Sequence, residues 1–245
     1  PGLAQRRPHL SLAQVFARAC VGGDAPEVIV EIHLGARLPA MSIVGLAETA
    51  VRESRDRVKA ALLNAGFDFP QRRITISLAP ADLPKEGSRF DLPIALGILV
   101  ASKQAPGGVL ANHEFVGELS LSGELKPVHG VLPVAIHASK KGRNLLVPAG
   151  NAAEAALARG RATLQASCLL DVVAWMKGEL SLSAVSLPQA LPAPATADLS
   201  DVVGQYRARR ALEVAAAGGH NILFTGSPGT GKTMLASRLP GSLPP

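Results

Sequence analysis

One stretch near the end of the chain decides the fold of its C-terminal part: Ile222-Leu223-Phe224-Thr225-Gly226-Ser227-Pro228-Gly229-Thr230-Gly231-Lys232-Thr233. Its first four residues predict an apolar strand, and the other eight match the pattern G-x-x-x-x-G-K-T. Residues 234–239 then predict a helix. A strand that turns through glycines into a helix is the context in which this motif binds phosphate. This context disfavours the alternative, a glycine-rich turn that matches the motif by chance.

The chemistry of this loop follows from its residue types. Glycines let the backbone curl so that several N–H groups point at one anion, beside the N-terminus of the helix. Lys232 is expected to reach the β- and γ-phosphates, and the Thr233 hydroxyl to ligate Mg²⁺. The nucleotide-binding residues predicted here are Gly226, Ser227, Pro228, Gly229, Thr230, Gly231, Lys232 and Thr233.

Composition places the chain among globular proteins. Its 245 residues are 47% hydrophobic and 18% charged, which is enough for one large domain or two smaller ones. No apolar run approaches the ~20 residues of a membrane helix, and the N-terminus lacks a signal-peptide core. We therefore expect a cytoplasmic protein without a membrane partner. Cys20 and Cys168 have no metal-ligand spacing and are expected to be buried thiols.

The basic residues give a weaker signal. A net charge of +6 permits nucleic-acid binding, but one Trp, one Tyr and six Phe argue against base-stacking platforms. Any DNA contact is therefore expected mainly to phosphates. The alternative is that the basic residues of one helix only form a solvated face, whose charge Asp56 partly neutralises. The candidate contacts, three of them on a helix expected over residues 51–65, are Arg52, Arg55, Lys59, Arg72 and Arg73.

Residues 187–196 carry three prolines among small residues, which predicts a linker. The expected organisation is a domain at 10–185, a linker at 186–199 and the start of a P-loop domain at 200–245. Hydrophobic periodicity before the linker predicts an α/β (α+β) fold. Strands are expected over 27–34, 74–78, 144–147 and 161–166. Helices are expected over 51–65, 92–100, 131–138, from 151 and over 167–176, and after the linker over 206–217.

Several polar residues are expected to cap helices rather than to bind ligands. Asp91 suits the start of the 92–100 helix, Asn151 with Glu154 resembles a capping box, and Ser167 precedes the 167–176 helix. The cluster Lys85, Glu86, Arg89 and Asp91 could instead contact a ligand. The six histidines show no metal spacing, so no metal site beyond Mg²⁺ at Thr233 is predicted.

Longer segments carry a family resemblance. They are PAMSIVGLAETAVRESRDRVKAAL at 39–62, ISLAPADLPKEGSRFDLPIALGIL at 76–99 and DVVGQYRARRALEVAAAGGHNILFTGSPGTGKTMLASRLPGSLPP at 201–245. On these segments the chain resembles the magnesium-chelatase-like AAA+ ATPases of the ComM (YifB) type from about residue 12 onward. Members of that family continue beyond residue 245, so the resemblance implies a fragment that ends after the phosphate-binding loop.

The resemblance implies an N-terminal domain with a ribosomal-protein-like fold. This domain would be similar to the proteolytic domain of Lon and to the C-terminal domain of the RadA repair ATPase. It implies ATP and Mg²⁺ as cofactors, a hexameric ring in the full-length protein, and branched or single-stranded DNA as partner. The activity implied is ATP-driven branch migration during natural transformation. Val203, Gly204 and Gln205 belong to the segment that would contact the adenine.

A protease function is disfavoured by the positions that match Lon. The nucleophile segment P-K-D-G-P-S aligns with residues 84–89, where Arg89 takes the serine's place and Ser88 matches only after a shift of register. Leu132 stands where the partner lysine belongs. A serine without a base is a weak nucleophile, so Ser88 is not expected to be catalytic and no catalytic residue is predicted in this fragment.

Two other functions remain open on the sequence. One is the motor subunit of a magnesium chelatase, which the Lon-like domain disfavours. The other is a non-catalytic binding and assembly domain. Because the acidic and water-positioning residues of a complete P-loop domain are not among these residues, we expect no significant ATP hydrolysis from this chain. We also expect little hydrogen-exchange protection from residue 198 onward.

Overall fold

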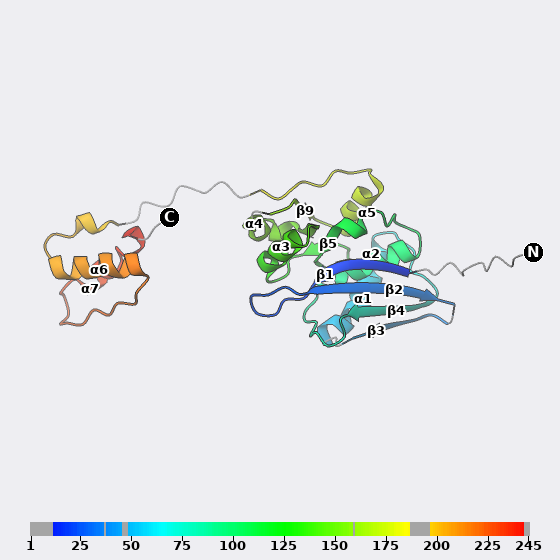
Figure 1. Cartoon of the computed structure of the whole chain (residues 1–245), viewed down its shortest axis with the longest axis horizontal. Coiled ribbons are helices and arrows are strands. Elements are labelled where there is room, and N and C mark those ends of the chain that lie inside the picture. Colours follow the sequence, from blue (N-terminus) through cyan, green and yellow to red (C-terminus); the bar gives the residue numbers. More distant parts are fainter. Residues whose placement is uncertain (1–11, 37, 46–48, 159, 187–196, 243–245) are drawn as a thin grey trace, which may run out of the picture. The chain divides into compact units, whose positions relative to one another are not determined.

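The structure, a computed structural model, describes residues 12–36, 38–45, 49–158, 160–186 and 197–242, without the side chains of Thr49, Ala50 and Arg52. The chain divides into two compact units, Pro1–Pro188 and Gln189–Pro245 (Figure 1). Most of the predicted linker, residues 187–196, lies outside the described residues. Each unit is therefore described by itself.

Helices and strands are interspersed along the first unit. In chain order they are β1 (Leu12–Arg18), β2 (Glu27–Gly35), β3 (Ala40–Val44), α1 (Thr49–Asn64), β4 (Arg73–Ala79), α2 (Asp91–Ala101), η1 (Leu110–Asn112), β5 (His113–Phe115), β6 (Glu118–Leu119), β7 (Leu125–Lys126), α3 (Val131–Lys140), β8 (Asn144–Pro148), η2 (Ala149–Asn151), α4 (Ala152–Ala156), β9 (Thr163–Ala166) and α5 (Leu169–Lys177).

A seven-stranded sheet organises this unit, in the order β3-β4-β2-β1-β5-β8-β9. β2 pairs antiparallel with β1 and β4, with Val15 opposite Val30 and Ile32 opposite Ile76. The pairs β3-β4, β1-β5, β5-β8 and β8-β9 are parallel. A mostly parallel sheet with helices between its strands confirms the predicted α/β class. β1 and β3 were not predicted from the sequence.

Alternating burial places α2 on one face of the sheet. Val15, Val30 and Ile76 are fully buried, whereas their strand neighbours are partly exposed, as a sheet covered on that face requires. α2 packs against β1 and β2, and α1 packs against α2 (Figure 1). A Cβ on Gly97 of α2 would lie 2.4 Å from Cγ1 of Ile32, so only glycine permits this close approach.

The other end of the sheet is covered on both faces. Within β8, Leu146 belongs to the large core cluster, and its neighbours Leu145 and Val147 belong to a second cluster with residues of α3 and α4. Successive strand residues point to opposite faces, so the two clusters lie on opposite sides of the sheet. This explains why β8 reads as a continuous apolar run.

Two buried carboxylates, Glu114 and Asp91, form ion pairs inside this unit. Glu114 of β5, fully buried, accepts from Nε of Arg18 at 2.5 Å and from its Nη2 at 2.7 Å, and from Arg143 at 3.2 Å. Asp91 accepts from Nε of Arg57 at 2.8 Å, which ties α2 to α1. Burial raises the pKa of Asp91, against the opposing effect of its hydrogen bonds. Buried charges of this kind need their partners.

The predicted helix caps were wrong in detail. Asp91 is the first residue of α2, but its carboxylate turns to Arg57 and to the Leu119 N–H at 3.2 Å instead of capping the helix. Ser167 does not cap α5, which begins after Cys168. For Asp91, tertiary partners compete with the local N–H groups, whereas Ser167 stands one residue before the N-cap position, which Cys168 occupies.

Asn151 and Glu154 likewise form no capping box. The Asn151 amide instead brackets Val128, accepting from its N–H at 2.9 Å and donating to its carbonyl at 2.8 Å. Glu154 accepts from the N–H groups of Val131 and Leu132, the first residues of α3. Glu154 therefore caps a helix that precedes it in the chain, where free N–H groups favour a carboxylate.

The second unit contains η3 (Leu199–Asp201), α6 (Tyr206–Gly218), α7 (Lys232–Ala236) and η4 (Pro240–Ser242). α6 confirms the predicted helix, and α7 ends earlier than expected. No strand forms at residues 222–225, because within residues 197–242 no other strand is present to pair with them. The hydrophobic core cluster of the second unit has four buried members: Leu199, Val202, Leu212 and Leu235.

Two features are absent from the residues that the structure describes. Among them, no helix is both long and apolar enough to cross a bilayer. Within the same residues, no three His, Cys, Asp or Glu side chains are grouped as metal ligands. Cys20 and Cys168 are free but half-buried, not fully buried as predicted, because Cys168 lies at the exposed start of α5 and Cys20 follows the end of β1.

Candidate nucleotide-binding site

Three glycines shape the loop between residues 226 and 231. Gly226, Gly229 and Gly231 have φ angles of 154°, 83° and 82°, which side-chain-bearing residues rarely adopt. The Thr230 hydroxyl donates to the Ser227 carbonyl at 3.0 Å and closes the turn. α7 begins directly after Gly231, with Lys232 as its first residue. The sequence motif therefore becomes an exposed curl of backbone that leads into a helix.

The Lys232 ammonium lies across this curl. Its Nζ donates to the carbonyls of Gly226 at 2.9 Å and Ser227 at 2.8 Å, and lies 3.4 Å from Oγ1 of Thr230. These are neutral acceptors, so a phosphate oxygen would be a stronger partner for the same ammonium. The residues present therefore fit a nucleotide phosphate.

The magnesium side of the site is less complete. Thr233 is exposed in the first turn of α7. The three carboxylates of residues 197–242 hydrogen-bond elsewhere: Asp198 and Asp201 cap η3, and Glu213 pairs with Arg210 at 3.0 Å. From this part of the chain, only the Thr233 hydroxyl stands where the motif places an Mg²⁺ ligand.

Gln205 connects the segment before α6 to the loop. Its Nε2 donates to the Thr230 carbonyl at 3.1 Å. Gly204 and Gln205 have φ angles of 72° and 53°, so the chain turns sharply at the start of α6. The Val203 side chain is 95% exposed. Of the three residues expected near the adenine, Gln205 is the one that touches the loop by a side chain.

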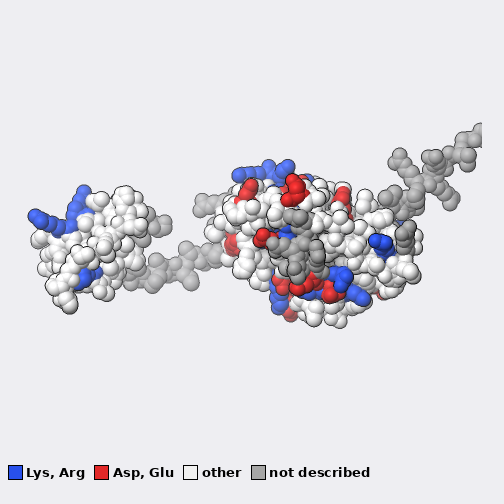
Figure 2. Space-filling model, turned by 90° about the horizontal axis from the view of Figure 1, so that it is seen from below, with Lys and Arg blue, Asp and Glu red and all other residues white. Residues whose placement is uncertain are grey.

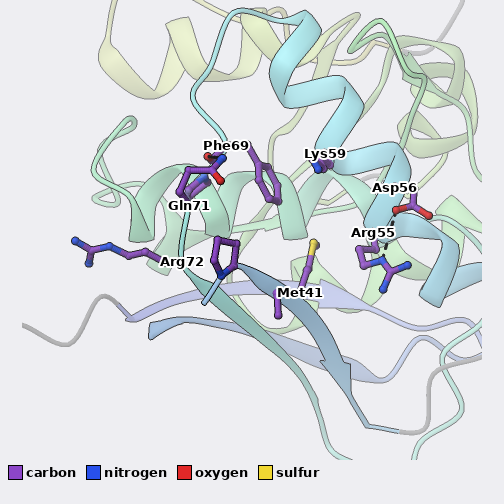
Figure 3. A pocket seen from close by; sticks show the side chains of 10 residues that line it. Met41, Arg55, Asp56, Lys59, Phe69, Gln71 and Arg72 are labelled. Carbon is purple, nitrogen blue, oxygen red and sulfur yellow. Dashed lines mark hydrogen bonds and ion pairs between the residues drawn. The ribbon is translucent and has the colours of Figure 1, made fainter. Parts of the chain in front are cut away.

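A second candidate surface lies in the first unit, between β3, α1 and the segment before β4. It is a pocket of about 280 Å³ that brings together three of the predicted DNA contacts, Arg55, Lys59 and Arg72, with Asp56 (Figure 3). Arg73, the first residue of β4, does not line it. The Arg52 side chain lies outside the described residues. We call this hollow the basic pocket.

The positive charge near the basic pocket is limited to a few side chains. Nε of Arg55 lies 3.5 Å from Oδ1 of Asp56, and Arg57 turns away from the pocket toward Asp91. Figure 2 shows acidic and basic side chains intermixed on one face of this unit. The basic pocket therefore offers a few cations at short range rather than a broad positive surface.

Comparisons with known proteins place both surfaces in one family. The family described as "Subunit ChlI of Mg-chelatase" matches residues 30–151, and "Magnesium chelatase, subunit ChlI" matches residues 198–245. The competence protein ComM of Haemophilus influenzae is 51% identical over 96% of this chain and 47% of its own length. The YifB protein of Salmonella typhimurium is 50% identical, with the same coverage.

The chain belongs to the magnesium chelatase ChlI-like family. It spans about half the length of the curated relatives that it matches. The loop at residues 226–233 lies in the second region that matches the ChlI-like family, and the basic pocket lies in the first.

Ser88 also lies in the first ChlI-like region. Within the described part of the chain, its hydroxyl has one hydrogen-bond partner, the Glu118 carboxylate. Lys85, three residues earlier, is fully buried and donates to the Pro80 carbonyl; its pKa is lowered by burial. Arg89 donates to the His129 carbonyl at 2.8 Å. The cluster predicted as caps or ligand contacts is therefore largely engaged in internal bonds of this ChlI-like unit.

Sequence reasoning missed the apolar residues of the basic pocket. Met41 and Phe69 line it beside the predicted cations. Because β3 was not predicted, Met41 was not assigned to any strand or surface. Phe69 was not considered as a base contact because the chain has few aromatic residues. The sequence did offer one signal for Phe69, since it stands only three residues before Arg72, a predicted DNA contact.

Proposed function

We propose that this chain supplies the nucleotide-gripping element of an ATP-driven motor that remodels DNA. The single observation that carries the proposal is the Lys232 ammonium, held across a glycine curl by two backbone carbonyls. A triphosphate would replace those carbonyls as its partner.

The residues of the loop have separate parts in this proposal. Backbone N–H groups of residues 226–233 bind phosphate oxygens, and Lys232 neutralises charge on the β- and γ-phosphates. Thr233 offers its hydroxyl to Mg²⁺. ATP supplies the free energy of its phosphoanhydride bond. Gln205 couples the segment before α6 to the loop, so that this segment senses whether a nucleotide is bound.

The DNA part of the proposal is supported by a relative and by charge. The Haemophilus relative is named a competence protein, and the ComM (YifB) type that this chain resembles is expected to drive branch migration of DNA during natural transformation. The basic pocket supplies cations that suit phosphates. We infer a cytoplasmic, ring-forming, hexameric motor that drives branch migration in the full-length protein. The first unit would be a Lon-like module without protease activity.

A second candidate is a motor subunit of a magnesium chelatase. It is favoured by the description of the family, which names the ChlI subunit of that enzyme in both matching regions. In a third reading, the chain is only a binding and assembly domain.

A branch-migration assay separates these candidates. It uses a labelled synthetic four-way junction, ATP and Mg²⁺, and a protein of the relatives' full length that carries this chain. We expect ATP-dependent resolution of the junction that is lost in Lys232→Ala. A matched control is Lys177→Ala, an exposed lysine at the end of α5 in the first unit. ATP hydrolysis without junction movement, together with Mg²⁺ insertion into a porphyrin, would favour the chelatase.

A further inference from the structure

We propose that the basic pocket holds one nucleotide of single-stranded DNA, with its base against Phe69 and Met41 and its phosphates on Arg55, Lys59 and Arg72. This inference rests on the proposed DNA function and gives it a site in the first unit. It adds a base contact to the sequence-based expectation that any DNA contact would be mainly to phosphates.

The basic pocket has the size and the walls for a nucleotide. Its volume is about 280 Å³, and its apolar wall comes from Met41 on β3 and Phe69 and Pro70 in the segment before β4. Figure 3 shows the Phe69 ring and the Met41 side chain between α1 and β3. Phe69 is half-buried and packs against the core cluster, so its ring is fixed in place. A fixed ring can stack on a base with little loss of entropy.

The charges of the basic pocket suit an anion. Three cations, Arg55, Lys59 and Arg72, stand against one carboxylate, Asp56, which gives a net charge of +2. Arg72 is exposed and has no ion-pair partner among the described residues. An exposed guanidinium that extends outward, as Figure 3 shows for Arg72, is free to bind a phosphate.

Lys59 joins the apolar wall to the charged rim. Its Nζ lies 5.5 Å from the centroid of the Phe69 ring, within the range of a cation–π contact. An ammonium at this distance from a stacking ring lies close to the sugar and phosphate of any base that rests on the ring. The same contact holds the charge of Lys59 beside the Phe69 ring on one side of the basic pocket.

A neighbouring hollow extends the surface. It is lined by Leu34, Ala101, Ser102 and Lys103 and shares Pro70, Gln71 and Arg72 with the basic pocket. Arg72 therefore stands between two hollows, and Lys103 adds a further cation on the far side. A strand that crosses Arg72 would place successive phosphates on both sides of it. Base faces are hidden in a duplex, so an aromatic pocket favours a single strand.

The test compares two oligomers of equal charge. One is a fluorescent thymidine 20-mer, and the other is an abasic 20-mer that keeps the sugar-phosphate backbone but has no bases. Affinities for the whole 245-residue chain are measured by fluorescence anisotropy over a range of salt concentrations. The variants are Phe69→Leu and Arg72→Gln, and the matched control is Lys141→Gln, an exposed lysine after α3.

The expected results separate base from phosphate. Phe69→Leu weakens binding of the thymidine oligomer by about five-fold or more and leaves the abasic oligomer within about two-fold. Arg72→Gln weakens both oligomers and lowers the salt slope by about 0.7. Lys141→Gln changes neither by more than about two-fold. Thermal unfolding of each variant shows whether the first unit is intact. Arg72→Gln changes only an exposed side chain, so it still tests the site if Phe69→Leu unfolds the protein.

Five outcomes would overturn the inference. Equal loss on both oligomers in Phe69→Leu would remove the stacking role, and equal loss in Lys141→Gln would reduce the surface to general charge. Competition by poly-glutamate as strong as that by the thymidine oligomer would indicate an acidic peptide instead. Binding that survives in both pocket variants would overturn this site while the DNA function stands, whereas no binding by the unaltered chain would overturn both.

Discussion

The large core cluster of the first unit joins buried residues from β1, β2, β4, α1, α2 and α5, whereas that of the second unit has four buried members. The first unit adds buried ion pairs, such as Arg18 with Glu114. The second relies on local devices, including the Asp198 cap and the bond from Gln205 to Thr230. Apolar burial and internal ion pairs therefore fix the fold of the first unit, whereas the candidate nucleotide site lies in a unit with a small core, which a bound ligand would stabilise substantially.

The largest expected effect tests the buried charges of the first unit. Glu114→Ala leaves the buried Arg18 without its carboxylate, so we expect a loss of about 3–5 kcal/mol in the free energy of unfolding. Urea denaturation measures it, and Glu179→Ala, an exposed carboxylate after α5, is the matched control. Equal stability of the two variants would show that this ion pair does not matter to the first unit.

A smaller effect tests the link between Gln205 and the loop. Gln205→Ala removes the bond to the Thr230 carbonyl, and we expect Mg²⁺-ATP to bind about two- to ten-fold more weakly. Gln205→Gly removes the same bond but suits the left-handed backbone at this position. We expect both variants to lose affinity alike, as calorimetric titration would show. Unchanged affinity in both would mean that the segment before α6 does not sense the nucleotide.

The smallest effect concerns acid and the cap of η3. The Ser200 N–H, donating to the carboxylate at 2.7 Å, holds the pKa of Asp198 below its ordinary value of 3.8. A lowered pKa means that the cap stabilises the folded state fully above pH 3.8 and is lost as the pH falls through the lower, folded-state value. The Ser200 amide resonance should move in that range. Asp198→Asn should abolish the movement, and a shift that persists in this variant would refute the assignment.

Sequence reasoning succeeded where one local pattern decides a structure. The alternation at residues 74–78 predicted β4, and the glycines and Lys232 predicted the curl of the loop. Both follow from residues that are neighbours in the chain. The α/β class followed in the same way, from the order of helix and strand signals.

Prediction from sequence failed where the structure of a residue depends on a partner that is distant in the chain. Asp91 and Glu154 were expected to cap their own helices, and instead they bond to Arg57 and to the start of α3. The basic pocket joins Met41, Lys59 and Phe69 from separate segments, so no spacing along the sequence could show that they meet. Residues 222–225 carry a strand pattern, but a strand also needs a neighbour to pair with.

Hydrogen exchange with and without Mg²⁺-ATP tests the central claim most directly, because it follows both units of the whole chain in one experiment. Without nucleotide, we expect the amides of residues 198–242 to exchange much faster than those of β1, β2 and α2. Mg²⁺-ATP should then slow exchange at residues 204–206 and 226–236, with no change in the first unit, and Lys232→Ala should abolish the response. An exchange pattern in the second unit that nucleotide leaves unchanged would contradict the account.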